Sequence, residues 1–85
     1  MKRVIVDVRE PYEYKENHVA GAINIPPSDL LSGAKALGEI PKDSEIILYC
    51  KSGARSNMSI NILRDLGYTN LINGINADQV RRKYL

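Results

Sequence analysis

The stretch that decides the fold of this 85-residue chain is Glu45-Ile46-Ile47-Leu48-Tyr49-Cys50-Lys51-Ser52-Gly53-Ala54-Arg55-Ser56. Its first half is a continuous apolar run, which is typical of a β-strand that other elements cover on both faces. Its second half is a short polar loop, and a helical pattern begins directly after it. A buried strand that feeds a helix in this way is typical of α/β proteins. Cys50, the sole cysteine of the chain, lies at the junction.

The position of Cys50 favours a thiolate. The loop and the start of the helix turn backbone N–H groups toward the end of the strand, and such groups stabilise negative charge. Lys51 and Arg55 add two cations, so we expect the Cys50 pKa to lie below the free value of roughly 8.5. Since only the thiolate is a nucleophile, Cys50 is the predicted catalytic residue. The competing interpretation is a small buried apolar residue, but such a cysteine belongs inside a strand or on the apolar face of a helix.

The length of the loop indicates what it can hold. Four residues separate Cys50 from Arg55. A cysteine phosphatase or an arsenate reductase needs a wider ring, with five residues between these positions, because its amides must enclose a tetrahedral oxyanion. A shorter loop suits a terminal sulfur on the cysteine or a small sulfur oxyanion. Gly53 favours such a cradle, because a loop with successive inward N–H groups usually needs a positive φ angle.

The rest of the chain alternates between strand and helix patterns. Strands are predicted at residues 3–8, 22–25, 45–49 and 70–72, and helices at residues 11–16, 28–37, 54–66 and 77–84. This order predicts one α/β domain over residues 1–85, with a mainly parallel central sheet and helices on both faces. In the helix over 54–66, the residues expected to face the sheet are Met58, Ile62, Leu63 and Leu66.

Two charged residues at the end of the first predicted strand are expected near Cys50. In open α/β sheets, ligand sites lie beyond the carboxyl ends of the strands, and Asp7 and Arg9 end a strand as Cys50 does. A carboxylate beside the sulfur would oppose thiolate formation, so supporting roles are predicted for both residues. Asp7 would hold Arg55 or a loop amide, and Arg9 would pair with Asp7 or Glu10.

Three segments of the sequence form a recognisable set: residues 4–10 with 12–14, residues 18–26 and residues 49–56. In their order and spacing they resemble the rhodanese family of sulfurtransferases, and the resemblance covers nearly the whole chain. The resemblance implies that Cys50 accepts a sulfane sulfur from a donor such as thiosulfate and holds it as a persulfide. It passes the sulfur to cyanide, a thiol or a protein acceptor. The resemblance also implies a cradle formed by Lys51, Ser52, Gly53, Ala54 and Arg55, and no cofactor.

The sequence departs from the family pattern at both ends. The first strand begins almost at Met1, where the family often has a preceding helix. Near the C-terminus the family commonly has a Gly-Gly pair followed by an aromatic residue, but residues 71–76 read Leu-Ile-Asn-Gly-Ile-Asn. The sequence contains neither Trp nor Phe, so the aromatic wall of the usual pocket is missing or is supplied by Tyr. We expect this difference to affect substrate selectivity.

Other polar residues offer alternative chemistry. His18 with Cys50 would make a protease-like dyad, but its place before a strand predicts that it hydrogen-bonds a turn. Ser52 is expected to contribute its amide, and Ser56 to cap the helix or pack beneath the loop. Two other functions remain open: a catalytically silent module of the same fold that binds a partner through the loop, and a cysteine phosphatase or arsenate reductase.

Composition excludes several classes of protein. One cysteine rules out an internal disulfide and a cysteine-based zinc site, and a single histidine disfavours any metal site. The net charge of +2 does not indicate nucleic-acid binding. No apolar run approaches the ~18 residues of a membrane span, and no signal peptide is recognisable. A cytoplasmic location is expected, although a removed leader would leave no trace.

Arg81, Arg82 and Lys83 form a basic cluster in the last predicted helix. We interpret it as complementing the dipole of that helix; the alternative is weak attraction for an anionic donor or an acidic partner.

Overall fold

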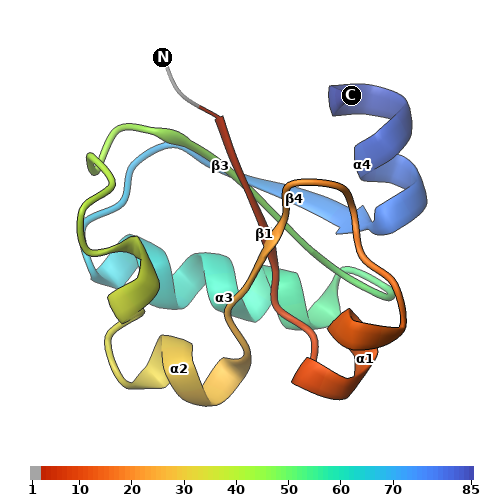
Figure 1. Cartoon of the computed structure of the whole chain (residues 1–85). Helices are drawn as coiled ribbons and strands as arrows, with labels where there is room; N and C mark the ends of the chain where they lie inside the picture. The colour runs from red at the N-terminus through yellow and green to blue at the C-terminus, as the bar shows by residue number, and fades with distance from the viewer. Residues whose placement is uncertain (1–2) are drawn as a thin grey trace.

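Four parallel strands form the central sheet of the computed structural model, which describes residues 3–85. The sheet has the order β2-β1-β3-β4, and its strands are β1 (Arg3–Asp7), β2 (Ile23–Asn24), β3 (Glu45–Cys50) and β4 (Leu71–Asn76). The helices are α1 (Pro11–Glu16), α2 (Pro27–Leu31), the 3-10 helix η1 (Lys35–Leu37), α3 (Ala54–Asp65) and α4 (Ala77–Tyr84). The predicted α/β fold with a parallel sheet is confirmed (Figure 1).

Helices cover both faces of the sheet, as Figure 1 shows. On one face Leu48 of β3 belongs to a buried cluster with Leu30 of α2 and Leu63 of α3. On the other face the neighbouring residue Ile47 belongs to a cluster with Val80 of α4. Successive side chains of a strand point to opposite faces, so a strand covered on both sides needs apolar residues at every position. This explains the continuous apolar run in the sequence.

The register of the strands brings their carboxyl ends together at one edge. Asp7 of β1 lies opposite Tyr49 of β3, and Cys50 lies opposite Asn76 of β4. The β3–α3 loop, the loop after β1 and the start of α4 therefore meet at this edge (Figure 1). This is the place that the sequence predicts for the ligand site.

The helix predicted over residues 28–37 is wrong in its extent. It divides into α2 and the short η1, because the chain between them takes positive φ angles at Gly33 (+106°) and Ala34 (+51°). A right-handed helix cannot pass through such residues. The remaining elements agree with the predicted ranges within one or two residues, except that β4 extends to Asn76 instead of ending at Ile72.

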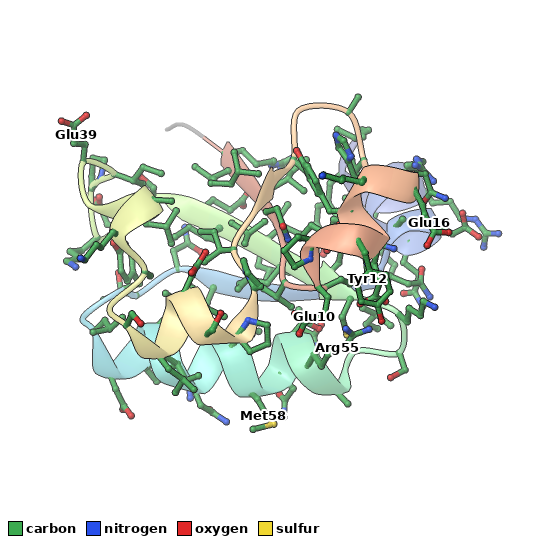
Figure 2. The ribbon with its side chains drawn as sticks, turned by 60° about the horizontal axis from the view of Figure 1, so that its bottom comes forward. Glu10, Tyr12, Glu16, Glu39, Arg55 and Met58 are labelled. Atoms are coloured by element: carbon green, nitrogen blue, oxygen red, sulfur yellow. The ribbon has the colours of Figure 1, made fainter. Side chains whose placement is uncertain are left out.

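The buried face of α3 also differs from the prediction. Met58 was expected to face the sheet, but it is 66% exposed and points away from it (Figure 2). Leu66 is 38% exposed and lies just beyond the helix. The buried residues of α3 are Ser56, Ser59, Ile60 and Leu63, which have helical spacing. The spacing of apolar residues did not predict this buried face, because two of its four residues are serines. Their hydroxyls are buried with hydrogen-bond partners.

An irregularity in β4 allows this strand to pass closely over β3. The pairing shifts register between Leu48 and Tyr49, and Ile75 adopts a φ of +74°, which is unusual for a β-branched residue. A Cβ at Gly74 would lie 2.6 Å from a methyl carbon of Val80, so α4 packs where only glycine fits. Among the helices of residues 3–85, none has the length and apolar character that crossing a membrane requires.

Candidate active site

The Cys50 thiol lies at the end of β3 beneath the loop that starts α3. Its side chain is nearly buried, and the Gly53 amide donates a hydrogen bond to Sγ over 3.1 Å. Gly53 has a φ of +93°, a backbone conformation in which a side chain is strained, so the turn favours glycine. Of the expected cradle residues, Gly53 thus donates its amide to the thiol.

Hydrogen bonds lower the pKa of Cys50 against the effect of burial. Burial raises the pKa of the thiol, but the Ser56 hydroxyl and three backbone amides outweigh it and bring the pKa to about 7. The amides are those of Ser52, Gly53 and Ser56. The lowered pKa agrees with the sequence prediction, and the predicted backbone amides are among its causes, while the charge of Cys50 in turn raises the pKa of Arg55. At pH 7 a large share of the thiol is thus ionised.

Ser56 was expected either to cap α3 or to pack beneath the loop. It packs beneath the loop, because Gly53 is the N-cap residue of α3. The Ser56 Oγ lies 3.6 Å from Cys50 Sγ and 2.6 Å from Asn73 Oδ1. A hydroxyl has one proton to donate, and Asn73 is the nearer acceptor beside a neutral thiol. A thiolate attracts that proton more strongly because the hydrogen bond becomes charge-assisted.

Asn73 braces the loop and was not predicted from the sequence. Its Nδ2 donates to the Gly53 carbonyl over 3.1 Å, and its Oδ1 accepts from the Ile75 amide over 3.0 Å. It therefore links the bulged part of β4 to the turn that holds the thiol. The sequence did contain one indication of its importance: Asn73 precedes Gly74 at the position where the rhodanese family commonly has the first glycine of a Gly-Gly pair.

Arg55 is held by Glu13 and not by Asp7, which corrects the prediction. The guanidinium donates to both carboxylate oxygens of Glu13, over 2.7 and 3.1 Å. This hydrogen bonding lowers the Glu13 pKa to about 2. Figure 2 shows Arg55 beside the start of α1, with its charge directed to that helix. Lys51 lies 3.8 Å from the same carboxylate, but its side chain is 71% exposed.

Glu13 could have been found from a local motif. It closes a capping box with Glu10 at the start of α1, and its carboxylate accepts from the Glu10 amide over 3.0 Å. The Glu-Pro-x-Glu spacing of residues 10–13 predicts this cap from the sequence. The partner Arg55 is 42 residues away, and only the folded chain reveals that pairing.

Asp7 and Arg9 form the buried pair that the sequence offered as one alternative. Asp7 is fully buried and accepts hydrogen bonds from the Arg9 guanidinium over 2.7, 3.0 and 3.1 Å. The Tyr49 hydroxyl also donates to Asp7, and the Val19 amide donates to that hydroxyl. Arg9 binds the Asn17 carbonyl as well. This hydrogen-bond network holds the loop after β1 and the segment after α1 in place beside the site.

A pocket of about 620 Å³ opens beside the thiol. Its lining residues come from the loop after β1, the β3–α3 loop and α4: Arg9, Asn17, Cys50, Lys51, Asn76, Ala77, Asp78 and Arg81. The contributions from α4 were missed by sequence reasoning. The sequence pattern alone does not place α4 close to the thiol. The register of β4 against β3, in which Cys50 pairs with Asn76, brings the start of α4 beside it.

His18 lies outside this lining and makes no dyad with Cys50. It is exposed, stacks on the Tyr14 ring and hydrogen-bonds through Nδ1 to the Tyr14 carbonyl over 2.8 Å. His18 therefore hydrogen-bonds the end of helix α1, whereas the sequence predicted a bond to a turn. Within residues 3–85, no three side chains of His, Cys, Asp or Glu lie in a group that could hold a metal ion.

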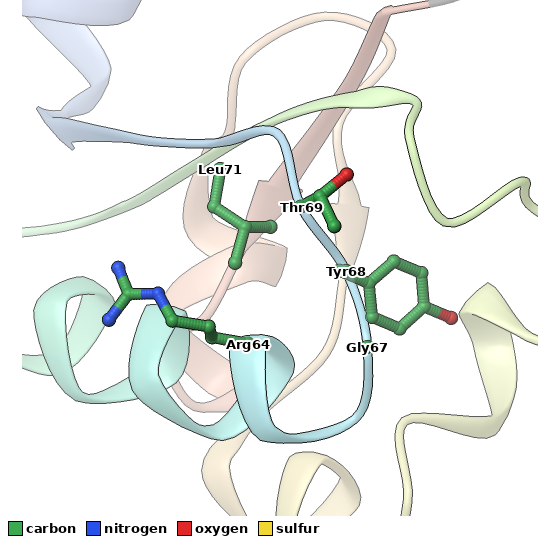
Figure 3. Close-up of a pocket in the computed structure, with 5 residues that line it drawn as sticks. All are labelled: Arg64, Gly67, Tyr68, Thr69 and Leu71. Carbon is green, nitrogen blue, oxygen red and sulfur yellow. The ribbon is translucent and has the colours of Figure 1, made fainter.

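A second hollow of about 340 Å³ lies at the other end of α3. Figure 3 shows the residues that line it: Arg64, Gly67, Tyr68, Thr69 and Leu71. The Tyr68 hydroxyl is engaged with the Leu37 carbonyl over 2.9 Å. The lining of this hollow includes no cysteine, histidine or carboxylate, so the Cys50 pocket is the better candidate for chemistry.

We expect Ser56→Ala to raise the Cys50 pKa from about 7 toward the free value of roughly 8.5. The variant loses the hydroxyl donor, so thiolate formation and reaction with an alkylating probe would shift to higher pH. Ser59→Ala is the matched control, because Ser59 is also buried on α3 but donates to the Arg55 carbonyl. Ultraviolet absorbance of the thiolate against pH measures the shift. Equal curves for the two variants would contradict the role given to Ser56.

Comparison with known proteins identifies the chain. The family model of the Rhodanese-like domain matches residues 1–78. The chain belongs to the rhodanese-like domain family. This membership confirms the resemblance seen in the sequence, and the thiol site lies within the matched range.

Two curated relatives carry sulfurtransferase names. The rhodanese-like domain is 41% identical over 78 residues to a thiosulfate:glutathione sulfurtransferase of Saccharomyces cerevisiae, across 79% of this chain and 55% of that protein. It is 36% identical over 69 residues to the thiosulfate sulfurtransferase PspE of Escherichia coli, across 80% of this chain and 64% of that protein. The chain spans between 18% and 64% of the length of the curated relatives that it matches.

Solved structures share the fold. A rhodanese from E. coli with anions has a TM-score of 0.80 at 32% identity, and the match covers 92% of this chain and 91% of that chain. The human single-domain sulfurtransferase TSTD1 has a TM-score of 0.75 at 26% identity and covers 98% of this chain and 84% of that chain. The rhodanese-like domain therefore has the architecture of this family over almost all its length.

Proposed function

We propose that this rhodanese-like domain is a sulfurtransferase that moves a sulfane sulfur through a persulfide on Cys50. The observation that carries the proposal is the Cys50 thiol with a pKa of about 7 under the Gly53 amide. Such a thiol is ionised and nucleophilic near neutral pH. The names of the two curated relatives support thiosulfate as the donor and a thiol as the acceptor. A cytoplasmic location remains part of this proposal.

The first half of the reaction charges the cysteine. The Cys50 thiolate attacks the outer sulfur of thiosulfate, a new S–S bond forms, and the S–S bond of the donor breaks. Sulfite leaves with the electron pair of that bond. The charge now rests on the outer sulfur of the persulfide, under the loop amides of residues 51–55, which take the place of water.

The second half returns the enzyme to its starting state. A thiolate or cyanide attacks the outer sulfur, and the bond between this sulfur and Cys50 breaks with its electron pair left on Cys50. The cycle is therefore ping-pong and balanced without a cofactor. Lys51, the exposed cation of the loop, attracts the donor anion. Arg55 braces the loop through Glu13 instead of contacting the substrate.

The alternative of a silent binding module has one observation against it. A module that only docks a partner does not need a thiol with four hydrogen-bond donors around it, and these donors are present here. A protein that accepts sulfur from Cys50 would be compatible with both the sulfurtransferase and the binding module.

Formation of thiocyanate from thiosulfate and cyanide tests the proposal: we expect parallel double-reciprocal lines, the sign of ping-pong kinetics. Absence of turnover would support the module.

Loop size gives a further prediction. Because the loop has four residues between Cys50 and Arg55, hydrolysis of aryl phosphates should equal the Cys50→Ser background. We expect one residue inserted after Gly53 to reduce sulfur transfer, since it moves the amides away from Sγ. Release of nitrophenolate measures phosphatase activity, and thiocyanate measures sulfur transfer. Robust phosphatase turnover by the native chain would overturn the ring-size argument.

A further inference from the structure

The pocket beside Cys50 is larger than a small donor requires. Its volume of about 620 Å³ lies within the ~300–1,000 Å³ of pockets that hold drug-sized ligands. Thiosulfate reacts through the sulfur next to its oxyanion group, so that group must stay close to Sγ and Lys51. The part of the pocket formed by α4 is left for the body of another molecule. Under the proposed function, that molecule is the sulfur acceptor.

Three cations line the pocket: Arg9, Lys51 and Arg81. Arg9 is bound by Asp7, and Lys51, which lies 3.8 Å from Glu13, is assigned to the donor anion under the proposed function. Arg81 has weaker contacts: its guanidinium lies 3.8 Å from an Asp78 oxygen and 3.4 Å from the His18 carbonyl. Both distances exceed the ordinary hydrogen-bond range. Arg81 thus has donors available for a planar anion, and its side chain is about half exposed.

The start of α4 fixes where Arg81 stands. The Asn76 side chain caps the helix by accepting from the Gln79 amide over 2.9 Å, and Val80 is buried against the sheet. Asn76 is the strand partner of Cys50. Arg81 follows Ala77 by four residues, which places its backbone about 6 Å further along the helix. A ligand that reaches both the sulfur and Arg81 must therefore extend along this side of the pocket.

We propose that Arg81 determines acceptor specificity by binding a carboxylate, so that the preferred acceptor is a low-molecular-mass thiol that carries one. This inference rests on the proposed function. The acceptor thiolate attacks the outer persulfide sulfur, forms a new S–S bond and releases the Cys50 thiolate. Arg81 takes no part in this bond change and only binds the acceptor.

The test uses two acceptors that differ at one group, N-acetylcysteine and its primary amide. Protein loaded with thiosulfate and freed of donor is mixed with each acceptor, and the loss of persulfide is followed over acceptor concentration. We expect Arg81→Gln to raise the half-saturating concentration of N-acetylcysteine about tenfold. The values for the neutral amide and for cyanide should stay unchanged. The N-acetylcysteine effect should shrink with added salt, because the side chain is half exposed.

Arg82→Gln is the matched control, because Arg82 is the next residue on α4, is exposed and does not line the pocket. It should leave both acceptors unaffected, while Arg81→Lys should recover part of the affinity for N-acetylcysteine. Equal losses in Arg81→Gln and Arg82→Gln would overturn the proposal, as would equal losses for the acid and the amide. A higher thiosulfate requirement for loading Arg81→Gln, with normal acceptor binding, would assign Arg81 to the donor instead. Failure of the native protein to load would refute the proposed function itself, and this inference with it.

Discussion

Replacing Cys50 by Ser is expected to abolish sulfur transfer, with thiocyanate formation falling to the uncatalysed background. A serine hydroxyl does not ionise near neutral pH, and the sequence contains no second thiol to replace Cys50. Loss of a covalent nucleophile typically removes several orders of magnitude of rate, about 10³-fold or more. The colour of the ferric thiocyanate complex measures the rate. The thermal melt of the variant serves as the control for folding.

The serine variant should melt close to the native protein, because the side chain is nearly the same size and Cys50 lies at the end of its strand. Turnover by a folded Cys50→Ser protein would contradict the persulfide mechanism. Loss of turnover together with unfolding would require Cys50→Ala as the second variant, with the same expected result.

Asp7→Ala is expected to have the largest effect on stability. Asp7 is fully buried and neutralises Arg9, which is 7% exposed, so its removal leaves a buried guanidinium without its partner. Breaking a buried pair on one side costs about 3–5 kcal/mol. A domain of this size has a free energy of unfolding near the low end of ~5–15 kcal/mol. We therefore expect a protein that is largely unfolded or unfolds at low urea concentration.

Urea unfolding followed by circular dichroism measures this change. Glu45→Ala is the control, because Glu45 of β3 pairs with Arg3 of β1 at the opposite, solvent-exposed end of these strands. An exposed pair of this kind is worth less than about 1 kcal/mol. If Asp7→Ala and Glu45→Ala lowered the free energy of unfolding equally, the stabilising role of the Asp7 network would be refuted.

The sequence predicted the fold because its signals were local and redundant. The run from Ile46 to Tyr49 required cover on both faces, and the helix patterns provided it. The extent of the helix predicted over residues 28–37 failed where backbone angles decided the outcome. Gly33 and Ala34 divide a continuous helical pattern, and no periodicity reveals that they take positive φ angles.

The site was predictable only in part, for a different reason. Cys50 and its loop lie within one contiguous segment, so their chemistry is readable from neighbouring residues. Glu13 and Asn73 approach that segment from elements far away in the chain, and their contacts depend on strand order and register. Arg55 illustrates the consequence: it reads as a free cation in the sequence, but Glu13 neutralises it in the fold.

The most direct test of the account is the intact mass of the native protein after exposure to thiosulfate and removal of the excess. The account predicts a gain of about 32 Da, the mass of one sulfur held as a persulfide, and the loss of this gain when cyanide is added. Cys50→Ser should show no gain under the same conditions. An unchanged native mass, or an equal gain in the serine variant, would contradict the central claim that Cys50 carries the sulfur.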